Sequence, residues 1–127
     1  MNDQEQNSIQ VEVETTYVEA QSDPAEDHYV FAYTINIRNT GKTGARLISR
    51  HWLITDANGD TQEVFGEGVV GQQPYLQPGE HFSYTSGTTL PTPVGTMQGS
   101  YQMRNEAGIH FDAPIAPFSL AIPGMLH

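Results

Sequence analysis

The sequence predicts an all-β fold, an antiparallel sandwich of two sheets with seven or more strands. Apolar and polar residues alternate at a period of two in several segments, and turn-forming residues recur about every eight to twelve residues. Helical apolar spacing is everywhere interrupted by proline or glycine. This pattern is typical of immunoglobulin-like or fibronectin type III-like domains. The 127 residues suffice for one core, so we expect a flexible segment 1–8 followed by a single domain over 9–127.

The first two strands are predicted by strict alternation. Residues 9–17 and 29–39 each place apolar side chains on one face only, which indicates strands that bury that face. The loop between them contains Pro24 and several acidic residues. The residues expected to point inward are Ile9, Val11, Val13, Thr15 and Tyr17 in the first strand, and Tyr29, Phe31, Tyr33, Ile35 and Ile37 in the second.

A third strand over 46–56 has no clear inner face. Trp52 shares one face with Arg50, but the other face is also partly apolar, with Leu47 and Leu53. Trp52 is the expected core anchor, because a large aromatic side chain dominates packing in a small sandwich.

Later strands are separated by glycine and proline turns. Asn58-Gly59 predicts a type I′ turn, which requires positive φ at both central residues, so residues 61–65 should pair back on the third strand. Further short strands are expected at residues 81–86, 99–105, 105–111 and 117–122.

The composition excludes several classes of function. The net charge of −10, from 15 acidic residues against 5 Lys and Arg, argues against nucleic acid and membrane partners, whose phosphates attract cationic side chains. Without cysteine there is no disulfide or thiolate metal site. No apolar run approaches the roughly 18 residues of a membrane span, and the N-terminus lacks the features of a secretion signal, so a cytoplasmic protein is expected.

The charges are unevenly distributed along the chain. Residues 1–27 hold eight acids and no Lys or Arg, whereas residues 28–55 hold four basic residues and no acid. The favoured interpretation is cross-strand pairing of opposite charges. The alternative is a basic patch that stays free for an anion or an acidic partner.

A glycine-rich stretch has the spacing G-x-G-x-x-G at Gly66, Gly68 and Gly71. In a dinucleotide fold these glycines lead into a helix, but here Pro74 follows and the helix is not expected. The favoured interpretation is a flexible or bulged connection that crosses from one sheet to the other, with glycines that supply positive φ. A backbone nest that binds an anion is the alternative.

Other residues give no chemical signature. The five histidines lack metal-ligand spacing, so neither a tight cobalt or magnesium site nor a cofactor is expected. Ser49 and His51 share a strand face, but no nucleophile elbow accompanies them, and no catalytic residue is assigned. An enzyme is therefore the less favoured class.

Three long motifs identify a family resemblance. SRHWLITDANG (49–59), GEGVVGQQPYLQPGEHFSYTSG (66–87) and GTMQGSYQM (95–103) closely resemble the bacterial ApaG family in order and spacing, and the similarity spans about residues 9–123. The resemblance implies a fibronectin type III-like sandwich, a genetic link to cobalt tolerance and magnesium efflux, and no established catalytic residue. Two departures from the family pattern are Thr88-Thr89, where Cys-Pro is common, and Gln98, where a basic residue is frequent.

We therefore expect a non-catalytic module that binds a protein partner through sandwich loops, with a homodimer as a further option. Segment 66–75 is the expected recognition site, and its Val69 and Val70 are equally compatible with the core. The alternative is a protein that binds an anion or nucleotide pyrophosphate through the glycine stretch 66–71. The candidate residues are Gly66, Gly68, Val70, Gly71, Arg46 and Arg50.

Overall fold

The computed structural model of the protein describes residues 7–124, and residues 1–6 of the expected flexible segment lie outside them. Eight strands and two short 3-10 turns make up the fold, which confirms the all-β prediction. Of the expected segment 1–8, the described Asn7 and Ser8 hydrogen-bond to Asn105 and Thr40. The elements are β1 (Ile9–Tyr17), η1 (Glu19–Gln21), η2 (Pro24–Glu26), β2 (Tyr29–Asn39), β3 (Ala45–Asp56), β4 (Thr61–Glu67), β5 (Tyr75–Leu76), β6 (His81–Leu90), β7 (Val94–Asn105) and β8 (His110–Ala121).

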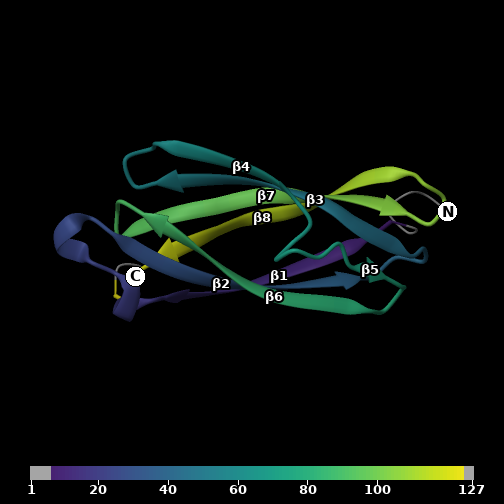
Figure 1. Ribbon diagram of the computed structural model, residues 1–127, viewed down its shortest axis with the longest axis horizontal. Helices are drawn as coiled ribbons and strands as arrows, with labels where there is room; N and C mark the ends of the chain where they lie inside the picture. Colours follow the sequence, from purple (N-terminus) through teal and green to yellow (C-terminus); the bar gives the residue numbers. More distant parts are fainter. Residues whose placement is uncertain (1–6, 125–127) are drawn as a thin grey trace.

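Two antiparallel sheets form the sandwich. One sheet has the order β1-β2-β6, and the other has the order β4-β3-β7-β8, with β5 paired to the start of β3. Figure 1 shows the strands of both sheets running along the long axis of the molecule. Three strands thus face four, as in fibronectin type III-like domains.

The core follows the predicted alternation of β2. Its residues Phe31, Tyr33, Ile35 and Ile37 are all buried. Trp52 of β3 is 2% exposed, as expected, and makes edge-to-face contacts with the rings of Tyr33, Tyr101 and Phe118.

A β-bulge resolves the ambiguous faces of β3. The register between β3 and β7 shifts between Leu47 and Ser49, so Ile48 is the extra residue. Leu47 and Trp52 are therefore both buried, although their odd separation places them on opposite faces of a regular strand. The expectation that Leu47 shares a face with Ser49 is wrong for this reason.

The hairpin at Asn58-Gly59 has the predicted pairing but not the predicted turn. Thr55 is opposite Thr61, so β4 pairs back on β3. Only Gly59 has positive φ, at 86°, while the Asn58 N–H is bound by the Asp56 carboxylate. The side chain of Asp56 stabilises a different turn, and the type I′ prediction is wrong.

The C-terminal part contains two long strands where several short ones were expected. Residues 106–109 form the turn between β7 and β8, so the strand predicted over 105–111 is wrong. Pro114 and Pro117 lie within β8, which tolerates them because it is the edge strand of its sheet. Pro117 also lies in a bulge, where the β7–β8 register shifts between Met97 and Gly99.

The two lateral sides of the sandwich differ. On one side the edge strands β1 and β8 contact each other, and Ile9, Val11 and Val13 of β1 pack against the core. On the other side the edge strands are β4 and β6, which do not pair. We call this the open side, and the candidate site lies there.

Candidate functional site

The glycine stretch forms a small hairpin on the open side. Gly66 lies in β4 opposite Arg50, and the chain then leaves the sheet at Gly68. Val69 and Gln72 pair with each other across a two-residue turn made by Val70 and Gly71. Both turn residues have positive φ, 43° and 80°, as a type I′ turn requires.

Close packing requires glycine at Gly68, and a side chain at Gly66 would displace the Arg50 guanidinium. A Cβ at Gly66 would lie 2.6 Å from Cζ of Arg50, and a Cβ at Gly68 would clash with the carbonyl oxygen of Gln72. Gly68 also has a positive φ of 62°. The positive φ of Gly68 and Gly71 agrees with the predicted use of glycine for backbone freedom. The predicted crossing to the other sheet is wrong, because β4 and β5 both pair with β3.

The backbone donors of this hairpin are largely occupied. The N–H groups of Gly68, Val69 and Gln72 donate to the carbonyls of Ile48, Gln72 and Val69, at 2.9, 2.8 and 2.9 Å respectively. The short strand β5 follows, and no helix begins here. An anion nest at this loop would have to rely on the remaining N–H groups of Val70 and Gly71.

The two valines have opposite environments. Val69 is 1% exposed and belongs to the core, whereas Val70 is 54% exposed. The hairpin does not lie at an end of the sandwich, because Glu67 and Gly68 lie beside Ser49 and Ile48, within the length of β3.

Arg46 lies beside Tyr75, where β5 pairs with the start of β3. Its guanidinium is 5.4 Å from the centroid of the Tyr75 ring and donates to the Gln73 carbonyl at 2.8 Å. On β7 its direct neighbour is Arg104, which in turn is opposite His110. Arg46 and Arg104 form a pair of like charges, which is unfavourable in a sheet.

The favoured pairing of acidic and basic strands is therefore wrong. β1 and β2 do pair, but Glu12 is opposite Asn36, Glu14 is opposite Thr34, and Arg38 is opposite Gln10. Among the described residues, the single carboxylate contact of a basic side chain joins His51 to Glu63. The side chains of Arg38, Arg46 and Arg50 are instead bound to carbonyls, and Arg104 lies beside Arg46, which favours the alternative of a free basic patch.

Arg50 points inward on the open side. Its Nη1 donates to the carbonyls of Glu67, at 3.0 Å, and Gly68, at 2.8 Å. It thereby fixes the start of the hairpin. Its charge has no carboxylate partner among residues 7–124.

A cleft between the two sheets opens beside Arg50. It consists of two adjoining hollows of about 250 and 280 Å³ that share the side chains of Tyr33, Arg50, Trp52 and Ser86. One hollow lies beneath the hairpin and the other continues toward Thr88 of β6. The further lining residues are Glu67, Val69, Val70, Gly71 and Tyr84 in the first hollow, and Ile54, Gln62, Val64, Gly87, Thr88 and Met97 in the second.

Two buried tyrosines, Tyr84 and Tyr101, lie between the sheets beside this cleft. The hydroxyls of Tyr84 and Tyr101 share a hydrogen bond of 2.5 Å across the two sheets. Burial raises the pKa of Tyr84 to about 12, and burial raises the pKa of Tyr101 further. The positive charge of nearby Arg50 lowers the pKa of both tyrosines, but by less than burial raises it. Both hydroxyls are protonated at neutral pH.

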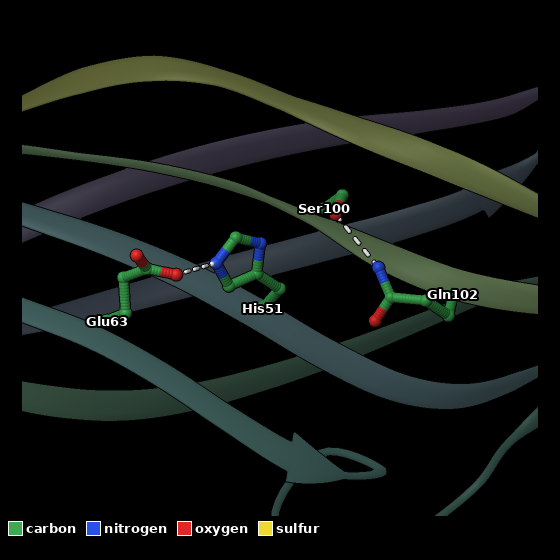
Figure 2. Close-up of polar contacts among 4 residues, drawn as sticks. All are labelled: His51, Glu63, Ser100 and Gln102. Atoms are coloured by element: carbon green, nitrogen blue, oxygen red, sulfur yellow. Dashed lines mark hydrogen bonds and ion pairs between the residues drawn. The ribbon is translucent and has the colours of Figure 1, made fainter.

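Polar residues also gather on the outer face of the second sheet. Figure 2 shows His51 bound to Glu63, at 2.9 Å between Nε2 and Oε2, and Gln102 donating to Ser100 at 2.9 Å. The Ser49 hydroxyl donates to Gln102, at 2.9 Å. Neither Ser49 nor Ser100 is hydrogen-bonded to the His51 imidazole. Ser49 and His51 therefore lie on one strand face but bind different partners.

No cluster of three metal-ligating side chains occurs within residues 7–124. The histidine of β3 is bound to Glu63, and that of β6, His81, accepts or donates a hydrogen bond with Asn36 at 2.9 Å. The described part of the chain also has no helix of the length and apolarity that crossing a bilayer requires.

Comparisons with known proteins identify the family. A model of the ApaG domain matches residues 19–105. The chain belongs to the ApaG family. It is 61% identical over 127 residues to Protein ApaG of Azoarcus sp. (strain BH72), with full coverage of both chains, and 60% identical over 119 residues to that of Nitrosospira multiformis, covering 94% of each.

Solved structures agree with this ApaG-family assignment. A crystal structure of a putative ApaA protein from Bordetella pertussis is 55% identical and superposes with a TM-score of 0.93, covering 95% of this chain and 98% of that one. The resemblance expected from the three motifs is confirmed, and the sandwich extends beyond the matched domain to include β1 and β8.

The sequence-based candidates lie on the open side or close to it, but they do not form one pocket. Arg50, Val70 and Gly71 line the cleft, whereas Arg46 lies on the surface with Tyr75. Sequence reasoning missed Ser86 and Thr88, which line the cleft from β6. Continued alternation from Phe82 and Tyr84 places both on the inner face, and this was the available signal.

Proposed function

We propose that this ApaG-family chain is a non-catalytic binding module that recognises a protein partner through the 65–75 surface. This name covers the exposed side chains of Phe65, Val70 and Tyr75, together with Arg46 beside the Tyr75 ring. Phe65 lies on the outer face of the sheet, stacked on His51, and Val70 lies at the cleft. The family's link to cobalt tolerance and magnesium efflux would then be exerted through the partner, since the proposal assigns no metal site to this chain.

The distribution of exposed apolar side chains carries the proposal. Four large hydrophobic residues are exposed among the described residues, and three of them, Phe65 at 71%, Val70 at 54% and Tyr75 at 36%, lie within this one stretch. Aromatic and arginine side chains contribute most of the binding energy in many protein interfaces. Arg46 beside the Tyr75 ring supplies such a pair.

Backbone strain at Val70 is consistent with this proposal. A β-branched residue at φ 43° is disfavoured, and such outliers occur more often at functional sites than elsewhere. Asparagine or glycine at this position would make the turn without strain. A strained and exposed valine therefore suggests a contact made outside the chain.

The loop geometry gives less support to the alternative, a site for an anion or nucleotide pyrophosphate on the glycine stretch. Three of its N–H groups already donate to carbonyls, and Arg50 donates to two carbonyls of the same stretch. A pyrophosphate at the hairpin would therefore have only the backbone N–H groups of Val70 and Gly71 as donors, unless these hydrogen bonds broke.

Capture of native partners by purified variants tests the proposal. We expect Tyr75→Ala and Val70→Asp each to remove partners that the parent chain retains, because each removes apolar contact area from the surface. Arg46→Glu should weaken the same interactions through charge reversal. Circular dichroism and thermal melting establish that each variant is folded.

Ile109→Asp is the matched control. Ile109 is 57% exposed but lies in the turn between β7 and β8, outside the 65–75 surface. It should leave partner capture unchanged. Equal loss of partners in this control and in Tyr75→Ala would contradict the proposal, as would full retention of partners by all three surface variants.

A further inference from the structure

The open-side cleft contains hydrogen-bond donors that have no acceptor among residues 7–124. Every fully enclosed side-chain nitrogen and oxygen of the described residues has a hydrogen-bond partner. The indole N–H of Trp52 and the hydroxyl of Tyr33 have none among these residues, although the two side chains are only 2% and 6% exposed. Their polar atoms therefore reach solvent where the residues line the cleft.

The opposite wall of the cleft adds hydroxyl groups. The inner face of β6 carries Phe82, Tyr84 and Leu90, but its two remaining positions are Ser86 and Thr88. Neither hydroxyl makes a hydrogen bond to another described residue, and both line the second hollow. Apolar side chains would be expected at these positions if they served only the core.

Arg50 supplies an unneutralised charge between these two walls. Nη1 has two hydrogens, and both are directed to the carbonyls of Glu67 and Gly68. The hydrogens of Nη2 and Nε remain, and together they form the planar fork that binds a carboxylate through two parallel hydrogen bonds. The two carbonyls hold this fork in place.

We propose that the open-side cleft binds a small organic carboxylate with a planar apolar body. The carboxylate pairs with the Nη2 and Nε edge of Arg50, and the body lies against Trp52 and Tyr33. Ser86 and Thr88 donate to the remaining acceptor lone pairs. The cleft shares only Val70 with the 65–75 surface, and the proposal does not depend on partner recognition there.

The shape and polarity of the cleft favour this class of ligand. Ile54, Val64 and Met97 line the second hollow, so an apolar group can extend from Arg50 in that direction. The two hollows, at about 250 and 280 Å³, are smaller than the range of about 300–1,000 Å³ that is typical of drug-sized ligands, so the ligand is a small one. The charge of Arg50, beside donors that have no acceptor, makes a carboxylate bind more tightly than a neutral ligand of the same shape.

The one tryptophan of the chain makes the test direct. Because Trp52 is the sole tryptophan, the nitrogen–proton correlation spectrum of the full-length protein contains one indole N–H signal, and it belongs to Trp52. Titration with phenylacetate should shift this signal with saturation below about 10 mM, and phenylacetamide, which has the same shape without charge, should bind at least about tenfold more weakly. Absence of a saturable shift, or equal shifts with the amide, would overturn the proposal.

Variants on the two walls locate the ligand. Arg50→Lys keeps the positive charge but removes the planar fork, so it should weaken phenylacetate binding by about tenfold. Thr88→Val should weaken it by a smaller factor. Thr89→Val is the matched control, because Thr89 is the next residue of β6 and points outward, where it is exposed; its affinity should equal that of the parent chain.

The variants also separate this proposal from partner recognition. Arg50 also fixes the hairpin, so Arg50→Lys could disturb folding. If it does, the phenylacetate affinities of Thr88→Val and Thr89→Val decide the question. Tyr75→Ala should abolish partner capture and leave phenylacetate binding intact, whereas Thr88→Val should weaken phenylacetate binding and leave partner capture intact. Equal binding by the Thr88 and Thr89 variants would contradict the carboxylate site even if Tyr75→Ala behaves as expected.

Discussion

The two lateral sides of this sandwich are built from the same alternating strands but have different chemistry. On the closed side, β1 and β8 contact each other and present apolar inner positions such as Val11, Val13 and Ile115. On the open side, the inner positions include Arg50, Ser86 and Thr88, and a cleft remains between β4 and β6. The fold therefore provides stability at one lateral edge and accessible polar groups at the other.

The largest expected difference between the sides is in packing energy. Ile115→Ala on the closed side should lower the free energy of unfolding by about 2–5 kcal/mol, because this side chain is 3% exposed and its removal leaves a cavity. Val64→Ala, half-buried at the open cleft, should cost about 1 kcal/mol. Urea denaturation measures both, and equal losses would show that the cleft is as tightly packed as the closed side.

Alkaline pH should destabilise the protein through the tyrosines beside the cleft. The pKa of Tyr84 is raised from 10.0 to about 12, so the folded state retains a proton that the unfolded state loses above pH 10. Stability due to this group is complete below pH 10 and falls by about 1.4 kcal/mol per pH unit between pH 10 and 12. Burial raises the pKa of Tyr101 as well, and it acts in the same direction.

Unfolding in urea at pH 9, 10, 11 and 12 measures this loss. The variant Tyr84→Phe should show a shallower decline above pH 10, although it is less stable at neutral pH because Tyr101 loses its hydrogen-bond partner. An unchanged slope in this variant would exclude Tyr84 as a source of the pH dependence.

Relief of strain at the hairpin should give a gain of about 1 kcal/mol. Val70→Asn creates the Asn-Gly pair that a type I′ turn favours, and asparagine tolerates φ near 43°. Gly71→Ala is the reverse control, since a Cβ there meets no atom within 4 Å and only the φ of 80° opposes it. Thermal melting should show opposite shifts for the two variants; a loss of stability in Val70→Asn would mean that the valine side chain packs favourably.

The smallest effect is expected for the inner hydroxyls of the open side. Thr88→Val should change the free energy of unfolding by less than about 0.5 kcal/mol, because the hydroxyl makes no hydrogen bond within the described chain. Asn39→Ala, by contrast, removes a buried amide that binds the carbonyls of Thr43 and Leu76, and should cost about 2 kcal/mol or more. A cost for Thr88→Val similar to that for Asn39→Ala would assign this threonine a structural role.

Much of the fold could be predicted from alternation, and the exceptions have local physical causes. The faces of β1 and β2 follow directly from residues such as Val11 and Ile35, because one side of each strand is uniformly apolar. The face of β3 does not, because the bulge at Ile48 shifts the alternation between Leu47 and Trp52. The Asn58-Gly59 turn differs because the Asp56 carboxylate binds a backbone N–H.

Less of the candidate site than of the fold could be predicted from the sequence. Arg50 was correctly placed on the face of Trp52, and the positive φ expected of the glycines is found at Gly68 and Gly71, whereas Gly66 lies within β4 in regular register. That Gly66 makes room for the Arg50 guanidinium depends on the register of β3 and β4, which the sequence does not specify. The cleft depends on β4 and β6 remaining apart, a relation between strands that are distant in the chain.

The prolines of β8 have a consequence for self-association. Strands at the margin of a sheet can template the addition of another chain, which is how many β-rich proteins form fibrils. Pro114 lacks the N–H that an added strand needs, and the bulge at Pro117 bends the backbone away from a straight ladder. Continuous β8-to-β8 ladders between copies are therefore blocked, and the protein should resist amyloid growth from this margin even when it is highly concentrated.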